Sequence, residues 1–255
     1  MLLKLLLVAA SVLLASLAAR RFGHAVGGTL AGLPMIAGPI MGFLLLQADT
    51  AAVRAIALAT LVCLPATVAH LLSFAWVATR RPWWHALAAA NVVFFGVGLL
   101  LPRLPLPDAA AGPLALGALL AGGLLFPRLS IVGGGVEIPR VELACRVAAA
   151  MALAGVIVGS AGLVPAAVSG LLLAVPITGN VLPCFTLPRH GAAATVALLR
   201  GFVRGLTGFG AFFVTLQAAL GSVGAGAAYA LAWAAALAVS LLLVGAHRRR
   251  ARAAA

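Results

Sequence analysis

The chain has 255 residues, of which 64% are hydrophobic and only 8% are charged, and its mean hydropathy is +1.20. Water-soluble domains are roughly 45–50% apolar and about 25% charged. This composition excludes an ordinary soluble enzyme, a disordered chain and a nucleic-acid-binding module. It predicts an all-α polytopic membrane helix bundle, because backbone groups in lipid must form their hydrogen bonds within helices.

The net charge of +13 is carried almost entirely by arginine, since Lys4 is the only lysine. A surface that binds nucleic acid needs interleaved aromatic residues on a soluble fold, whereas these basic residues punctuate apolar runs. They are typical of cytoplasmic loops, where lysine and arginine accumulate. The bias toward alanine, leucine, glycine and valine resembles that of proteins from GC-rich bacteria. We therefore expect a bacterial inner-membrane location, a lipid bilayer around the chain and no nucleic-acid partner.

Apolar runs recur along the whole chain. A helix that crosses a membrane needs about 20 predominantly apolar residues, and the sequence predicts nine such spans. The fifth of them is the shortest. The predicted spans are residues 2–19, 25–47, 52–79, 83–101, 112–127, 143–161, 163–187, 192–218 and 222–244.

The first apolar run has two interpretations. Lys4, the apolar core that follows it and the small residues at 15–18 are typical of a secretory signal peptide. Arg20 and Arg21 follow directly and would act as a stop-transfer pair. This pair favours a first helix that is retained in the mature protein.

The arginines predict the orientation of the spans. In the nine-span arrangement, most arginines fall on one side, and the other side holds only Lys4, Arg54 and Arg103 as basic residues, with Asp49 and Asp108. The positive-inside rule then places the N-terminus outside and the C-terminus in the cytoplasm. The arginines of the cytoplasmic side are Arg20, Arg21, Arg80, Arg81, Arg128, Arg140, Arg146, Arg189, Arg248, Arg249, Arg250 and Arg252.

A short motif occurs at corresponding places in the two halves of the chain. Residues 39–42 are Pro-Ile-Met-Gly, and residues 176–179 are Pro-Ile-Thr-Gly. Each motif lies in an apolar segment that precedes a long one, so we interpret the halves as two copies of a four-helix unit. An odd number of crossings separates equivalent helices, which predicts two inverted repeats, as in secondary transporters. The alternative is a coincidence between two segments rich in proline and glycine.

The first unit carries a family resemblance. Residues 30–34 are Leu-Ala-Gly-Leu-Pro, and an apolar run continues to Gln47. Residues 52–55 are Ala-Val-Arg-Ala and open a long helix that contains Pro65. In these stretches the chain resembles the small GlpM-like four-helix inner-membrane proteins. The resemblance implies little about activity beyond a loose link to polysaccharide production.

The second half resembles the same unit more loosely. It keeps Pro176 and Gly179 but has no clear counterpart of Pro34 or Pro65. The resemblance implies a tandem duplication of the GlpM-like unit. The predicted organisation is a first repeat at residues 1–104, a linker helix and cytoplasmic loop at 105–140, a second repeat at 141–246 and a basic tail at 247–255.

The segments at 25–47 and 163–187 are both interrupted by residues that weaken helices. Proline removes a backbone donor and frees a carbonyl one turn back, and in lipid that carbonyl needs another partner. Paired broken helices at corresponding positions are typical of a transport site, whereas a simple packing kink is the alternative. The predicted hinges are Pro34, Pro39, Gly42, Pro176 and Gly179.

Arg200 and Arg204 are four residues apart and share one face of the eighth predicted helix. At 1.5 Å per residue Arg204 falls ~18 Å along that helix, near mid-bilayer, where a charge costs at least ~2.5–3.5 kcal/mol. The acidic residues all fall in predicted loops or helix ends. We hypothesise that both arginines bind a small anionic solute. The alternatives are a lipid phosphate, water-lined packing against freed carbonyls, or a shifted helix that brings Arg200 to the cytoplasm.

Three further polar residues lie in predicted helices. Thr178 and Asn180 follow the interruption of the segment at 163–187 and would complete a solute pocket, although hydrogen bonds between helices are equally expected. His70 lies about 10 residues from the cytoplasmic end of its helix and is therefore deep. It either relays protons or packs as a hydrogen-bonded histidine.

The sequence has no HExxH motif, no paired intramembrane aspartates and no cysteine or histidine pair at a recognisable spacing. We therefore expect no enzyme activity, no metal and no cofactor. The predicted function is a small secondary permease for an anionic or amphipathic solute, and a homodimer or a membrane partner subunit is left open. The alternative is a non-transporting accessory or scaffold protein of a polysaccharide or envelope assembly system.

Overall fold

The computed structural model describes residues 24–129, 139–160 and 163–253, together with the isolated positions Leu6, Ala9, Ala10 and Leu13. The predicted first span at 2–19 lies outside the described residues apart from those four positions. All regular elements in the described ranges are helical. They are α2 (His24–Gly32), α3 (Ala37–Leu45), α4 (Thr50–Ala78), α5 (Trp83–Leu100), η1 (Leu101–Arg103), η2 (Asp108–Ala110), α6 (Ala111–Leu125), α7 (Arg140–Gly159), α8 (Ala166–Ala174), α9 (Ile177–Ala219) and α10 (Ala225–Ala253).

Local sequence signals explain where several helices begin. The Asp49 side chain accepts a hydrogen bond from the Ala52 backbone N–H at 2.7 Å and caps α4. Pro82, Pro139 and Pro165 directly precede α5, α7 and α8. Proline is suited to this boundary because its ring fixes φ near the helical value and it lacks the N–H that a helix start leaves unpaired.

Seven helical stretches in the described part of the chain are long and apolar enough to cross a membrane. The protein is therefore a multi-pass integral membrane protein. Most stretches begin and end within a few residues of a predicted segment. The predicted segments 163–187 and 192–218 are the exception, because one stretch, Ala166–Ala219, includes both. The bounds of the seven stretches are Val26–Leu45, Thr50–Ala78, Trp83–Arg103, Asp108–Leu125, Arg140–Gly159, Ala166–Ala219 and Ala225–Leu243.

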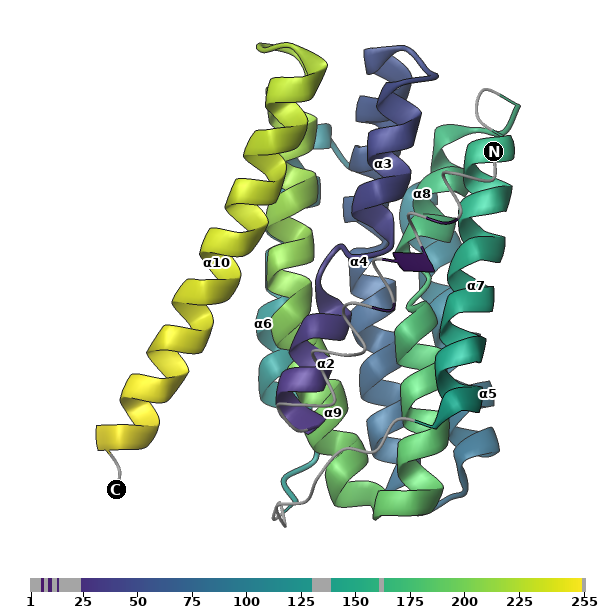
Figure 1. The fold of residues 1–255 in the computed structure, drawn as a ribbon, viewed down its shortest axis with the longest axis vertical. Coiled ribbons are helices and arrows are strands. Elements are labelled where there is room, and N and C mark those ends of the chain that lie inside the picture. The colour runs from purple at the N-terminus through teal and green to yellow at the C-terminus, as the bar shows by residue number, and fades with distance from the viewer. Residues whose placement is uncertain are drawn as a thin grey trace.

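The stretch Ala166–Ala219 contains 54 residues and is divided by two irregular points. A continuous helix of that length would extend ~81 Å, far beyond the ~30 Å hydrocarbon layer. The chain leaves the helical conformation at 175–176 and again at Gly191, which has φ 77° and ψ −179°. Only glycine adopts these angles without strain. Figure 1 shows that α9 reverses direction there, so residues 177–190 form its first arm and 192–219 its second arm.

The helices run roughly along the long axis of the molecule, and their connections gather at its two ends (Figure 1). The end that holds Gly191, here called the hairpin end, also holds the α4–α5 turn and the C-terminus of α10. The opposite end holds the α3–α4 and α9–α10 turns. The described arginines in or beside the connections at the hairpin end are Arg80, Arg81 and Arg128, together with Arg140 at the start of α7 and Arg189 in α9 near its turn.

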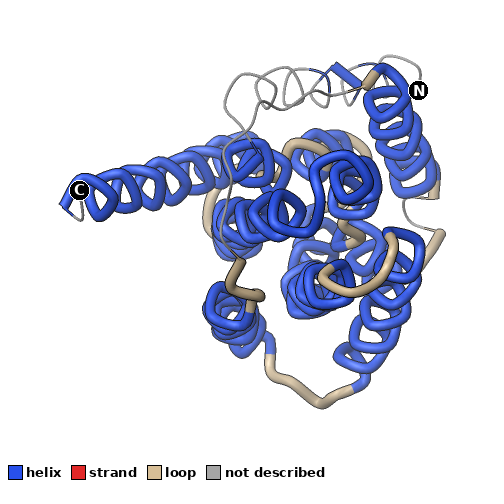
Figure 2. Tube along the Cα trace, turned by 90° about the horizontal axis from the view of Figure 1, so that it is seen from below, coloured by secondary structure: helices blue, strands red, loops and turns tan. Residues whose placement is uncertain are grey.

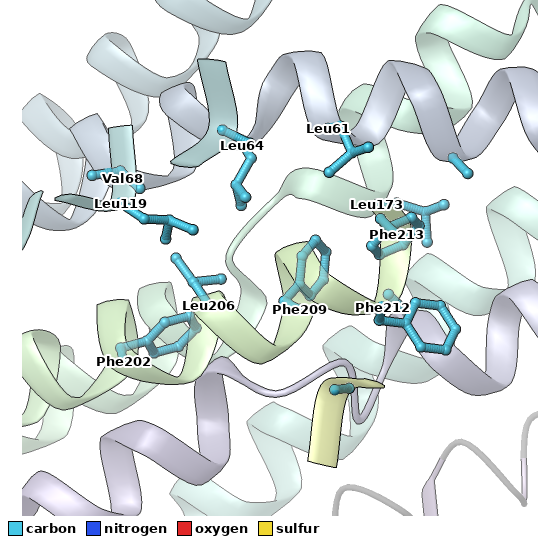
Figure 3. Packing of buried hydrophobic residues seen from close by; sticks show 14 of the residues in the cluster. Leu61, Leu64, Val68, Leu119, Leu173, Phe202, Leu206, Phe209, Phe212 and Phe213 are labelled. Atoms are coloured by element: carbon cyan, nitrogen blue, oxygen red, sulfur yellow. The ribbon is translucent and has the colours of Figure 1, made fainter. Parts of the chain in front are cut away.

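The core forms around α4 and the second arm of α9, which lie side by side. Leu61, Leu64 and Val68 of α4 face Phe202, Leu206 and Phe209 of α9 across the centre of the bundle (Figure 3). Two further helices pack on each of these long helices: α5 and α8 pack on α4, and α2 and α10 pack on α9. The two central helices therefore organise the positions of the shorter ones.

The helices α2 and α9 meet backbone to backbone. A Cβ atom added at Gly28 would lie 1.9 Å from the carbonyl oxygen of Leu198, and one added at Gly205 would lie 2.1 Å from that of Thr29. Gly32 is equally close, since its added Cβ would lie 2.2 Å from a backbone oxygen of α9. Glycines spaced four residues apart allow membrane helices to approach this closely.

Candidate functional site

Two helices are interrupted near the middle of the bundle (Figure 1). Residues 33–36 are non-helical between α2 and α3, and residues 175–176 are non-helical between α8 and α9. Two threonines supply donors to the backbone beside these interruptions. The Thr67 hydroxyl donates to the Ala174 carbonyl oxygen at 2.6 Å, and the Thr178 hydroxyl donates to the Ala31 carbonyl oxygen at 3.2 Å. The second bond joins the two interrupted helices directly.

A cavity of about 60 Å³ lies between the two interruptions. Its wall includes most of residues 30–37 from the first and all of 173–178 from the second. Among the described residues, the polar side chains on the wall are Thr67, Arg146 and Thr178, and the other lining residues are apolar. A bound water needs ~10–15 Å³ of such volume. The cavity therefore has room for a few water molecules or a small solute.

Arg146 is the charged residue at the cavity wall. It lies on α7 and forms an ion pair with Glu142, one helical turn nearer the hairpin end. Both residues are buried, with 3% and 4% of their surfaces exposed. Burial of charges is tolerated where they are paired and hydrogen-bonded. The Glu142 carboxylate also lies within electrostatic reach of Arg189 and His190 at the end of the first arm of α9.

Arg146 was expected among the arginines of the cytoplasmic side and not as a site residue. The structure places it inside α7, on the face that lines the cavity. The available signal was its spacing from Glu142, because an acid and a base four residues apart on an apolar helix pair with each other and leave the lipid face.

Thr178 and Pro176 line the cavity, as predicted residues of the second interrupted helix. Asn180 does not line it. Its side-chain oxygen accepts a hydrogen bond from the Asn91 side-chain amide at 2.9 Å, which ties the first arm of α9 to α5. A Cβ added at Gly179 would lie 2.9 Å from Leu71, so this glycine allows close packing on α4.

The hinge predictions for the first interrupted helix need correction. Pro34 lies in the interruption, but Pro39 is in the first turn of α3 and Gly42 is well inside that helix. Proline is tolerated in a first turn because the N–H it lacks would have no partner there. Gly42 instead makes room for an aromatic residue of α10, since an added Cβ would lie 3.0 Å from the Tyr229 hydroxyl.

Arg200 and Arg204 do not line the cavity, contrary to the sequence-based hypothesis. Phe202 and Leu206 of α9 line the cavity. Arg200 and Arg204 each precede one of these residues by two positions, which turns their side chains ~200° around the helix and away from the cavity. Arg200 donates to the Pro127 carbonyl oxygen at 2.9 Å, and Arg204 is exposed.

The structure also changes the position of Arg204 relative to the other helices, on which its predicted mid-bilayer depth was based. The prediction assumed that the helix starts at the membrane boundary, but α9 turns at Gly191 well beyond the end of α6 (Figure 1). The contact with Pro127, just past the end of α6, places Arg200 level with that end.

His70 is fully buried on α4, one turn from Thr67, and it does not line the cavity. Its imidazole lies edge-on to Phe94 at a centroid distance of 6.3 Å. Neither ring nitrogen makes a hydrogen bond of good geometry in the described part of the molecule, but the backbone of Ala90 and that of Gly179 lie within hydrogen-bonding reach of the imidazole. The imidazole therefore packs beside backbone groups of α5 and α9, and both expectations for His70 stay predictions.

We expect the variant His70→Leu to be more stable than the parent protein, because the contacts of the buried imidazole with the Ala90 and Gly179 backbone do not satisfy its ring nitrogens with good geometry. Leaving such a group unsatisfied costs about 1–3 kcal/mol. The matched variant Thr67→Val should be less stable, because it strips the Ala174 carbonyl of its donor. Thermal unfolding of the purified proteins in detergent measures both changes. A less stable His70→Leu protein would show that the imidazole is hydrogen-bonded in solution.

Within the described residues, no group of three or more histidine, cysteine or acidic side chains could hold a metal ion. Comparison with known proteins found no match for this chain among family models, curated proteins or solved structures. The site is therefore interpreted from its own geometry. It is a small cavity between two interrupted helices, and the described residues give it one buried arginine and two hydroxyl groups as polar side chains.

Proposed function

We propose that the protein is a small secondary permease whose solute site is the cavity between the two interrupted helices. The observation that carries the proposal is the composition of the cavity wall, which combines residues from both interruptions. In many transporters the substrate site lies near the bilayer midplane between discontinuous helices of two repeats. Here the interruptions lie near mid-height of the bundle and face each other across the cavity (Figure 1).

The helix contacts support an inverted repeat. The first part of each interrupted helix packs on the long helix of the other half: α2 on the second arm of α9, and α8 on α4. Both contacts use glycine, since an added Cβ at Gly170 of α8 would lie 2.7 Å from the backbone nitrogen of Thr60. The two interrupted helices also run in opposite directions (Figure 1). We propose nine spans in total, arising from duplication of a GlpM-like unit, with the hairpin end in the cytoplasm of a bacterium.

The cavity favours a small anion with a short apolar part. The planar guanidinium of Arg146 presents two parallel donors to a carboxylate or phosphate, and the rest of the wall is mainly apolar. In this mechanism the solute competes with Glu142 for Arg146. Binding would therefore loosen the ion pair that lies between the cavity and the hairpin end.

Alternating access at Thr178 tests the proposal without knowledge of the solute. The native cysteines at 63, 145 and 184 are first replaced by alanine, and Thr178→Cys is then introduced. We expect a membrane-impermeant maleimide to label this cysteine in right-side-out vesicles and in inverted vesicles, because a permease opens its site to each side in turn.

The matched control is Ala57→Cys, at a position on α4 that is fully buried and outside the cavity. This cysteine should stay unlabelled from both sides. Labelling of Thr178→Cys from one side only, or from neither, would contradict the permease proposal and favour the accessory or scaffold role.

A further inference from the structure

The two arginines that do not belong to the cavity form a second site. Arg200 and Arg204 lie one turn apart on the second arm of α9, close enough to act on each other electrostatically. No described acidic side chain balances them, because Asp49 and Asp108 lie at the opposite end and Glu142 pairs with Arg146. Like charges one turn apart destabilise each other. An anion that does not belong to the chain would therefore stabilise the two arginines by reducing their repulsion.

Arg204 lies where α9 and α10 diverge, and the surface between these two helices and α6 is here called the wedge. Arg204 and Gly208 share one face of α9, and at Gly208 that face is covered by α10, since an added Cβ would lie 2.3 Å from the Ser240 hydroxyl. Toward the hairpin end α10 diverges from the bundle (Figures 1 and 2). Leu243, which continues the face of Ala236 and Ser240 that packs on α9, is accordingly 43% exposed, whereas those two residues are buried. Arg204 is exposed where α10 no longer covers α9.

The other side of the wedge is α6. Its Leu120 and Leu124 are exposed by 63% and 81%, and Arg200 binds the Pro127 carbonyl oxygen just beyond its end. The wedge thus has apolar walls from α6 and α10 and a cationic group on α9. A free inorganic anion uses only the cationic group, whereas a phospholipid uses the cationic group and both apolar walls.

The end of α6 also indicates the depth of the arginines. The Trp76 indole N–H donates to the Leu125 carbonyl oxygen at 2.9 Å, and Trp76 is half exposed. Tryptophan with one apolar and one polar side is typical of the headgroup level. Arg200 lies at that level, and Arg204 is ~6 Å deeper along the helix. A long arginine side chain reaches back over such a distance.

We propose that this wedge binds an anionic phospholipid of the leaflet at the hairpin end. The phosphate lies between Arg200 and Arg204, and the acyl chains lie along the exposed leucines of α6 and α10. Guanidinium groups hold phosphate through charge-assisted, two-point hydrogen bonds. Exposed Arg128 adds to the positive potential that concentrates anionic lipid at a membrane surface. The proposal does not depend on the permease function.

Native mass spectrometry of the purified chain, with phosphatidylglycerol and phosphatidylcholine in competition, tests the site. We expect the parent protein to prefer phosphatidylglycerol. The double variant Arg200→Ala, Arg204→Ala should lose about 30-fold of this preference, and the single variant Arg204→Gln about fivefold, from the usual contribution of one arginine near an anionic surface. If the double variant does not fold, the lipid preference of the single variant Arg204→Gln tests the proposal instead.

The matched control is Arg103→Ala, which removes an exposed arginine at the opposite end of the bundle. It should keep the parent preference, and so should Arg204→Lys to a large extent. An unchanged lipid preference in the double variant would overturn the proposal. So would displacement of the lipid by an equal concentration of inorganic phosphate, because the apolar walls would then contribute nothing.

Discussion

Replacement of Gly205 by valine is expected to abolish the folded bundle. The added Cβ alone would lie 2.1 Å from the carbonyl oxygen of Thr29 and 2.8 Å from the Cα of Gly32. These are backbone atoms, so no rotation of a side chain relieves the overlap, and α2 must separate from α9. Overpacking typically costs 1–3 kcal/mol where side chains can adjust. With rigid backbone on the other side we expect a loss above ~4 kcal/mol, in the range of the most damaging substitutions.

Fluorescence-detected size-exclusion chromatography after expression measures this loss as a missing monodisperse peak. Gly205→Ala should give a folded protein with a clearly lower melting temperature, because helix separation need only accommodate one methyl group. The matched control is Gly117→Val on α6, where no atom lies within 4 Å of an added Cβ. A Gly205→Val protein with the parent melting temperature would show that α2 and α9 do not meet as described.

Removal of the Glu142 carboxylate is expected to cause the second large loss of stability. The variant Glu142→Ala leaves the buried guanidinium of Arg146 without its ion-pair partner. Breaking a buried pair by removing one charge typically costs ~3–5 kcal/mol, mainly because the remaining charge stays desolvated. The reverse variant Arg146→Met should cost less, because the Glu142 carboxylate keeps Arg189 and His190 within electrostatic reach.

A double-mutant cycle separates the pair from the individual side chains. The combined variant Glu142→Ala, Arg146→Met removes both charges, so we expect it to be more stable than Glu142→Ala alone. Chemical unfolding in detergent supplies the free energies, and Asp108→Ala, an exposed acid outside the cavity, is the control. Equal stability of Glu142→Ala and the parent protein would show that Arg146 finds another partner or reaches water.

The sequence predicted much of the fold because membrane insertion depends on properties of short stretches of chain. Run length and composition located the described spans, since every apolar stretch must hide its backbone in a helix. Proline identified both interrupted helices, Pro34 in one and Pro176 in the other. The separation of 163–187 from 192–218 also agrees with the break at Gly191, although its left-handed backbone was not foreseen.

Hydropathy and proline positions could not predict which arginine lines the cavity. Arg200 and Arg204 were expected in the solute site, and Arg146 was not, because depth and direction depend on where a helix enters the membrane and which neighbour it meets. The turn at Gly191 lies beyond the end of α6, which shifts the second arm of α9 along its axis.

The amino-acid sequence by itself determined that the chain is a multi-pass helical membrane protein with two interrupted segments, since hydropathy and proline act locally. Only the tertiary structure decided which side chains meet. It brought Arg146 to the cavity and left Arg204 on the outer face of α9. The physical reason is that a rotation of half a turn moves a side chain from the core to the lipid. That rotation is set by backbone contacts such as those of Gly28 and Gly205, which link residues far apart in the chain.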